Sequence, residues 1–165
     1  MLKRAGGFIA LGVAAILGTG TFVAYAQSQD AITQRRMVMR AIATAGTPPF
    51  EMSRGNMPFD LAKVQAGLKT YQTEAAKLKD LFPDSSKTGD TEAKAKIWTA
   101  RAEFNAAIET FIATSKAAAE AVKDEASFKA TYPKIGASCG GCHKEADGFA
   151  PRLGDSFKRL KQELK

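Results

Sequence analysis

The chain has 165 residues, with 24 Lys and Arg against 17 Asp and Glu, so its formal net charge is +7 at pH 7. This length suits one domain of ordinary size. The basic residues are spread out and the aromatic residues do not interleave with them, which argues against a nucleic-acid-binding protein. A mildly basic surface would instead steer encounters with acidic or anionic partners.

The N-terminus has the pattern of a secretory signal peptide. Lys3 and Arg4 precede an uncharged stretch from Ala5 to Ala26, which ends in Ala-Tyr-Ala. We expect residues 1–26 to be a signal peptide cleaved after Ala26, which leaves a mature domain of residues 27–165. Losing Lys3 and Arg4 would reduce the 24 basic residues to 22 against 17 acidic ones, a net charge of +5. The alternative is an uncleaved membrane anchor, because the uncharged stretch exceeds the usual apolar region of about 7–15 residues.

Two helices are predicted in the first half of the mature chain. Four residues at helical spacing form a stripe that predicts a first helix over residues 31–45: Ile32, Arg36, Met39 and Ala43. Pro48 and Pro49 are expected to end this helix, because proline cannot continue a helix. Asp60 is the expected N-cap of the second helix. The second stripe alternates steps of three and four, as in a bundle helix; its members are Leu61, Val64, Leu68, Tyr71, Ala75, Leu78 and Phe82.

Two more helices are predicted in the second half. The third is expected to run from about Thr91 to Lys123, with Trp98 beside its buried face. The residues of this face are Ile97, Phe104, Ile108, Phe111, Ser115, Ala118 and Val122. The fourth has Pro133 in its first turns and a stripe of Phe128, Tyr132, Ile135, Cys139, Cys142 and Ala146. No segment alternates with period two, so the fold class is all-α, an antiparallel four-helix bundle. In the extension of residues 147–165, Phe157, Leu160 and Leu164 predict a short amphipathic helical turn.

The sequence Cys139-Gly-Gly-Cys142-His143 near the C-terminus is typical of covalent c-type haem attachment. Helical positions three apart share a face, so both sulfurs can bond to the haem vinyls. His143 then becomes the axial iron ligand. It is the only histidine, which excludes a bis-His haem. We therefore expect one covalent haem c per chain, inside the bundle. Such attachment takes place outside the bacterial inner membrane, so the motif requires an export signal, which the N-terminus is predicted to supply.

Three other interpretations of these residues fit less well. A thioredoxin-like redox pair needs alternating strands and helices, which this chain lacks. A zinc site needs four Cys or His ligands, and the chain has three such side chains. A disulfide between Cys139 and Cys142 is awkward within a helix. With both cysteines bound to haem, no disulfide should stabilise the fold.

From about Ala31 to Ala146 the chain resembles class II cytochromes c, the cytochrome c′ family. The resemblance lies in the order of the haem motif and several weaker elements: Arg35 to Met39, Gly55 to Asp60, Phe82-Pro-Asp-Ser85, Lys96-Ile-Trp98, Phe104, and Ile135-Gly-Ala-Ser138. Of these elements, Phe82-Pro-Asp-Ser85 and Lys96-Ile-Trp98 look most like the low-spin cytochrome c-556 type. The resemblance implies a four-helix bundle with the haem motif near the end of its last helix.

The same resemblance implies two further site residues. Met39 stands where the low-spin members place the methionine that fills the sixth iron position. Met37 would point to nearly the opposite side of the helix, while Met52 and Met57 are expected in a loop. The alternative is that Met39 only packs in the core. Arg35 matches an arginine that contacts a haem propionate; the alternative is a solvated surface cation.

The sequence favours electron transfer as the function and leaves gas binding as the alternative, and neither is enzymatic. The first is a periplasmic monohaem cytochrome that carries single electrons between transient redox partner proteins, with iron held by His143 and Met39. The second is a five-coordinate cytochrome c′ that binds small gases such as NO or CO. Without a distal histidine or an evident proton donor, a haem enzyme fits poorly. A homodimer is compatible with either function.

Overall fold

A computed structural model describes residues 19–144 and 147–163. All regular elements in these residues are helical, which confirms the predicted all-α class. The four long helices are α1 (Thr19–Ser53), α2 (Leu61–Lys77), α4 (Arg101–Ala121) and α5 (Glu125–Cys142). The shorter elements are η1 (Leu78–Asp80), η2 (Asp84–Ser86), α3 (Lys96–Thr99) and α6 (Leu153–Glu163).

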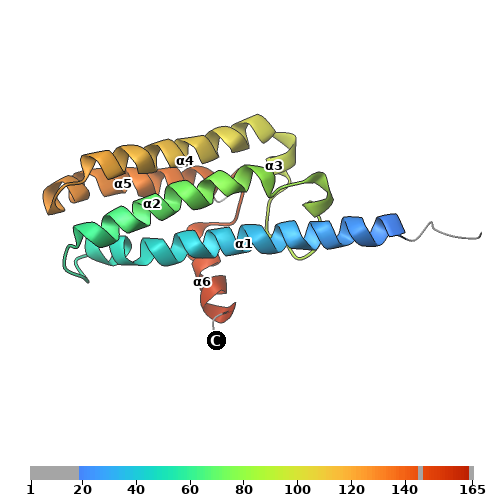
Figure 1. The fold of residues 1–165 in the computed structure, drawn as a ribbon, viewed down its shortest axis with the longest axis horizontal. Coiled ribbons are helices and arrows are strands. Elements are labelled where there is room, and N and C mark those ends of the chain that lie inside the picture. The colour runs from blue at the N-terminus through green and yellow to red at the C-terminus, as the bar shows by residue number, and fades with distance from the viewer. Residues whose placement is uncertain (1–18, 145–146, 164–165) are drawn as a thin grey trace, which may run out of the picture.

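The four long helices form an antiparallel bundle (Figure 1). Helix α1 packs on α2, α2 on α4, and α4 on α5. The N-terminal end of α1 extends beyond the other helices, and α6 projects away from the bundle (Figure 1). Two apolar clusters fill the interior, one around Tyr71 and Phe128 and one around Phe82 and Phe104. We call these core cluster 1 and core cluster 2.

The end of α1 differs from the prediction. Pro48 and Pro49 lie inside the helix, which continues to Ser53. Pro49 is fully buried against α2, and we attribute the tolerance of both prolines to this packing. The helix ends in a Schellman motif instead, in which the amide of Asn56 donates to the Glu51 carbonyl. Gly55, with a φ of 76°, adopts the left-handed conformation that this motif requires.

The buried face of α1 is centred one residue earlier than predicted. Its buried side chains are Ser28, Ala31, Ile32, Arg35, Val38, Ile42, Pro49 and Met52. Arg36, Met39 and Ala43 of the predicted stripe are only partly buried. The expected register is therefore wrong by one position. Met52 was expected in a loop and is in fact a buried helical residue of core cluster 1.

The remaining helices follow the predicted faces more closely. Asp60 caps α2 by accepting a hydrogen bond from the Lys63 amide at 3.1 Å, as predicted. The predicted third helix is divided into α3 and α4 because Ala100, with φ −127° and ψ 51°, leaves helical geometry. Its buried residues from Ile97 to Val122 nevertheless match the prediction. Helix α5 begins at Glu125, so Pro133 is an interior residue and the prediction for it was wrong.

The N-terminal prediction concerns residues that the structure describes only in part. Residues 1–18 lie outside the described residues, and Thr19–Ala26 form the first turns of α1. Ser28, two residues after the predicted cleavage position, donates a hydrogen bond to the Ser85 carbonyl at 2.8 Å. In the part of the chain described, no helix is both long and apolar enough to cross a membrane.

Gly67 allows α1 and α2 to approach closely. A Cβ added there would lie 2.9 Å from the Ala45 carbonyl oxygen and 3.3 Å from Pro49. We expect Gly67→Ala to lower the free energy of unfolding by about 1–3 kcal/mol, because a backbone atom must move. Urea unfolding of the purified protein measures this change. Gly136→Ala in α5 is the control, since its Cβ meets nothing within 4 Å. Equal losses in both variants would contradict this explanation.

Candidate haem site

The cysteines and histidine of the motif lie at the C-terminal end of α5. Asp124 begins this helix with a capping box: its carboxylate accepts from the Ser127 amide, and the Ser127 hydroxyl accepts from the Asp124 amide. Cys139 and Cys142 occupy the last turn, one helical turn apart. His143 is the C-cap, and its amide donates to the Cys139 carbonyl at 3.1 Å. The helix therefore carries both cysteines on its last turn, with the histidine directly after them, as the spacing predicted.

The two thiols are unpaired and partly buried, each against a different part of the core. Cys139 packs on core cluster 1 and Cys142 on core cluster 2. Burial raises the pKa of Cys139 to about 11 and raises that of Cys142 as well. Redox-active C-x-x-C pairs need a lowered thiol pKa, so these thiols are poorly suited to disulfide exchange. Their position between the two clusters suits attachment to one large apolar group.

His143 is partly buried and already oriented by a hydrogen bond. Its Nδ1 lies 2.6 Å from the carbonyl oxygen of Pro151, and a carbonyl only accepts, so Nδ1 carries the proton. Nε2 is then the unprotonated nitrogen with a lone pair for a metal. Burial lowers the pKa of His143, and the hydrogen bond to Pro151 partly opposes this shift. The lowered pKa favours a neutral imidazole, the form that binds iron.

The donor set fits haem better than a bare metal ion. Among the described residues, no group of three His, Cys, Asp or Glu side chains converges on a point where an ion could sit. The two thiols and the imidazole therefore do not form a zinc site. In c-type attachment the sulfurs bond to the edge of the macrocycle and only the histidine reaches the metal, so no convergence is needed.

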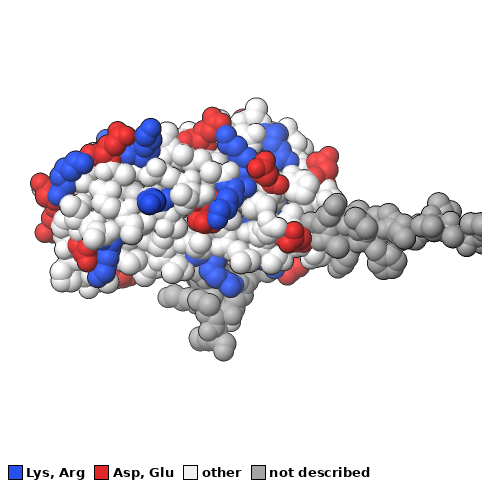
Figure 2. All heavy atoms as spheres, viewed as in Figure 1, with Lys and Arg blue, Asp and Glu red and all other residues white. Residues whose placement is uncertain are grey.

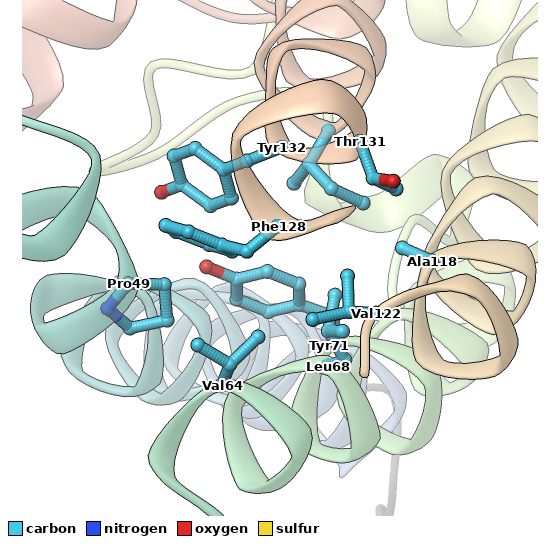
Figure 3. Close-up of a pocket in the computed structure, with 10 residues that line it drawn as sticks. Pro49, Val64, Leu68, Tyr71, Ala118, Val122, Phe128, Thr131 and Tyr132 are labelled. Carbon is cyan, nitrogen blue, oxygen red and sulfur yellow. The ribbon is translucent and has the colours of Figure 1, made fainter. Parts of the chain in front are cut away.

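An apolar cavity lies along the α5 stripe that leads to Cys139 (Figure 3). All four long helices line it, with Pro49, Val64, Leu68, Tyr71, Ala118, Val122, Phe128, Thr131, Tyr132 and Ile135. Burial raises the pKa of Tyr71 far above its usual range and that of Tyr132 to about 12. Cys139 lies close enough to contribute to both shifts. The two phenols, together with the Thr131 hydroxyl, are thus polar groups of this cavity lining, a role that the sequence analysis did not assign to them.

The methionines of α1 differ in their surroundings. Met39 is partly buried and packs on core cluster 1, the cluster that Cys139 also contacts. Met37 is 63% exposed, as its helical position predicted. Met57, in the turn before α2, also borders core cluster 1. Ligation of iron by Met39 stays a prediction.

Arg35 is 5% exposed, so it is not a solvated surface cation. Its Nη1 donates to the Leu81 carbonyl and the Ser86 hydroxyl, and its Nη2 to the Ser86 carbonyl and the Thr91 hydroxyl. The guanidinium also lies 4.8 Å from the centre of the Phe82 ring. Arg35 therefore fastens the connection between α2 and α3 to α1. The predicted propionate contact stays a prediction, and a propionate would have to share these donors or use Nε.

The surface shows no large field of one charge on the face drawn in Figure 2, where Lys and Arg alternate with Asp and Glu. Several pairs are within salt-bridge distance, among them Lys79 with Glu109 at 2.6 Å and Arg36 with Asp90 at 2.9 Å. The prediction that the protein does not bind nucleic acid stays a prediction.

Comparison with known proteins also indicates a haem protein with a four-helix bundle. The protein-family model described as Cytochrome C′ matches residues 30–145. A cytochrome c′ of Rhodopseudomonas palustris is 37% identical over 131 residues, covering 79% of this chain and 88% of the relative. A cytochrome c-556 of the same organism is 36% identical over 98 residues, covering 56% of this chain and 66% of the relative. A solved structure of cytochrome c′ from R. palustris has a TM-score of 0.70 at 36% identity, covering 75% of this chain and 98% of the other.

Proposed function

Since the chain belongs to the cytochrome c′ family of class II cytochromes c, whose members are non-enzymatic haem proteins with one covalent haem c, we propose that it is a periplasmic haem protein that binds small gases such as NO or CO. In this proposal Cys139 and Cys142 hold the haem and His143 is the axial ligand. When bound, haem c supplies an iron that exchanges one electron and accepts a small neutral ligand. Residues 1–26 act as the export signal.

The placement of Met39 carries the choice of gas binding over electron transfer. Met39 lies at the flank of the buried face of α1, whose centre is formed by Val38 and Ile42. Two branched apolar side chains at the centre of this face supply no ligand for the sixth position. The longer match to a cytochrome c′ than to a cytochrome c-556 favours the same choice.

The apolar lining near Cys139 suits a small neutral ligand. The cavity along α5 is lined by aliphatic and aromatic side chains, and its two phenols, Tyr71 and Tyr132, are hydrogen-bonded to each other. Diatomic gases need no charged partner for binding. Burial raises the pKa of Tyr71 far above its usual range, so its phenol keeps its proton at physiological pH.

A second function is supported by a separate observation. Met39 and Cys139 border the same core cluster, so a small rotation of α1 would bring the thioether toward a haem held by Cys139. In that case His143 and Met39 would both ligate iron, and the protein would carry single electrons between transient redox partners. A thioether ligand would raise the reduction potential relative to an imidazole.

Carbon monoxide titration of the reduced protein, combined with Met39→Ala, tests the choice. If the proposed gas binding is correct, the parent has a high-spin spectrum and binds carbon monoxide readily. Met39→Ala then leaves spectrum and affinity close to those of the parent and costs roughly 2 kcal/mol of stability, because only a partly buried side chain is lost. Met37→Ala, at an exposed position, is the control and should change neither quantity.

Two other results of this experiment would contradict gas binding. A low-spin parent that binds carbon monoxide slowly, and becomes high-spin and reactive in Met39→Ala, would reject gas binding in favour of the electron carrier. A spectrum that changes in Met37→Ala but not in Met39→Ala would contradict both functions, since it would require a different register of α1.

A further inference from the structure

The residues after the motif return to the end of α5 and are held there by backbone hydrogen bonds. The amides of Phe149 and Ala150 both donate to the Cys142 carbonyl, at 2.9 and 3.2 Å. The Phe149 carbonyl in turn accepts from the Lys94 amide at 3.0 Å. Backbone hydrogen bonds thus join this segment to α5 on one side and to the residues that precede α3 on the other.

Side-chain contacts anchor the same segment. Phe149 is 5% exposed and belongs to core cluster 2, where its ring centre lies 5.2 Å from that of Phe104. The Nζ of Lys96 lies 5.2 Å from the ring centre of Phe149 and donates to the Asp147 carbonyl at 3.1 Å. Pro151, two residues beyond this anchor, therefore has a fixed place beside His143.

We propose that the Pro151 carbonyl is a positioning group for the axial histidine, supplied by the segment that follows the haem motif. The hydrogen bond of 2.6 Å from His143 Nδ1 fixes the orientation of the ring and leaves Nε2 for the iron. This inference rests on the proposed ligation of iron by His143. It is independent of Met39, because it holds for five-coordinate and six-coordinate iron alike.

The hydrogen bond also influences the redox chemistry. An acceptor on Nδ1–H makes the imidazole a stronger electron donor, which stabilises oxidised more than reduced iron. The Pro151 carbonyl should therefore lower the reduction potential. A group that served only to pack the chain would leave the potential unchanged once the fold was intact.

Gly148 offers a way to displace Pro151 by a point substitution. A Cβ at Gly148 would lie 2.5 Å from the Lys144 amide nitrogen, 2.7 Å from the Lys144 carbonyl oxygen and 2.8 Å from the Cys142 carbonyl oxygen. These are backbone atoms, so Gly148→Ala must move the segment away from α5. Gly154→Ala, in α6, is the matched control because its Cβ would meet nothing within 4 Å.

The experiment measures the His143 ring by ¹H–¹⁵N NMR in the reduced, carbon-monoxide-saturated holoprotein. Ring-current shifts of the His143 carbon-bound protons report whether the ring ligates iron, which tests the premise separately. Solvent exchange of Nδ1–H reports the hydrogen bond. We expect slow exchange in the parent and in Gly154→Ala, and exchange about tenfold faster in Gly148→Ala. The reduction potential should rise in Gly148→Ala relative to Gly154→Ala.

Two results would overturn the inference. The first is rapid Nδ1–H exchange in the parent while the ring-current shifts show ligation, a measurement that depends on no variant folding. The second is a folded Gly148→Ala whose exchange rate and potential equal those of Gly154→Ala. Absence of the ring-current shifts would instead reject ligation by His143, and with it the proposed function.

Discussion

The double variant Cys139→Ala/Cys142→Ala is expected to lose covalently attached haem completely. The thioether bonds are the only links that survive denaturation, since a bond from His143 to iron breaks when the protein unfolds. Haem staining after denaturing electrophoresis measures this directly. The parent should give a stained band and the double variant none. Each single variant should keep one thioether and stain when it matures.

Ser138→Ala is the matched control for this experiment. Ser138 lies beside Cys139 in α5 and donates only to the Ile135 carbonyl at 2.8 Å within its own helix. Its removal should leave haem staining at the parent level. Staining of the double variant would mean that the haem is attached elsewhere, and the assignment of the motif would be wrong.

Arg35→Met is expected to lower the free energy of unfolding by about 2–5 kcal/mol, because each buried acceptor that loses its donor costs about 1–3 kcal/mol. The substitution leaves the carbonyls of Leu81 and Ser86 without their charged donor inside the protein. Burial, with a smaller effect of Arg36, lowers the pKa of Arg35 to about 10, so the guanidinium remains charged at neutral pH. Denaturant unfolding of the holoprotein measures the loss.

Arg36→Met is the neighbouring control. Arg36 pairs with Asp90 at the surface, where an ion pair contributes about 1 kcal/mol or less. Arg35→Lys should not restore stability, because one ammonium cannot reproduce four donors in a planar arrangement. If Arg35→Met instead shifts the reduction potential and leaves stability near the parent value, the arginine acts on a haem propionate and not on the connection between α2 and α3.

The parts of the fold that the sequence predicted well are those where one local signal decides the structure. The stripe from Val64 to Ala75 specifies the buried face of α2, although its predicted first member, Leu61, is 37% exposed. Asp60 has the side chain that the cap of α2 requires. The end of α1 was missed because the packing of Pro49 against α2 is a tertiary effect. The Gly55 signal for the true helix end was present in the sequence and was outweighed by the two prolines.

The register of α1 and the break at Ala100 have the same cause. The spacing from Ile32 placed Arg36 on the buried stripe, whereas the acceptors that hold Arg35 in the interior lie at positions 81–91, some fifty residues away. At Ala100 the following residue, Arg101, donates to the Phe82 carbonyl, which Trp98 also approaches. No pattern within the helix indicates such long-range bonds.

The residues of the candidate site also divide into those that a local motif predicts and those that depend on tertiary packing. Cys139, Cys142 and His143 form a local motif and were found from spacing alone. The role of Pro151 was not predicted, because every residue type has a backbone carbonyl. Its position beside His143 depends on the conformation of the chain between them. Tyr71 and Tyr132 were placed on the correct faces by periodicity, but their proximity to Cys139 depends on how α2 and α5 pack.

The order in which the helices pack has a consequence for how the protein matures. The main packing partners are α1 with α2, α2 with α4, and α4 with α5, so most contacts join elements that are neighbours along the chain. Chains with such short-range contacts fold rapidly. Because α5 depends chiefly on α4, the first three long helices could assemble while the last remained undocked. The haem-attachment enzyme would then meet an accessible motif on a nearly formed scaffold, and docking of α5 would carry the haem into the interior as the final folding step.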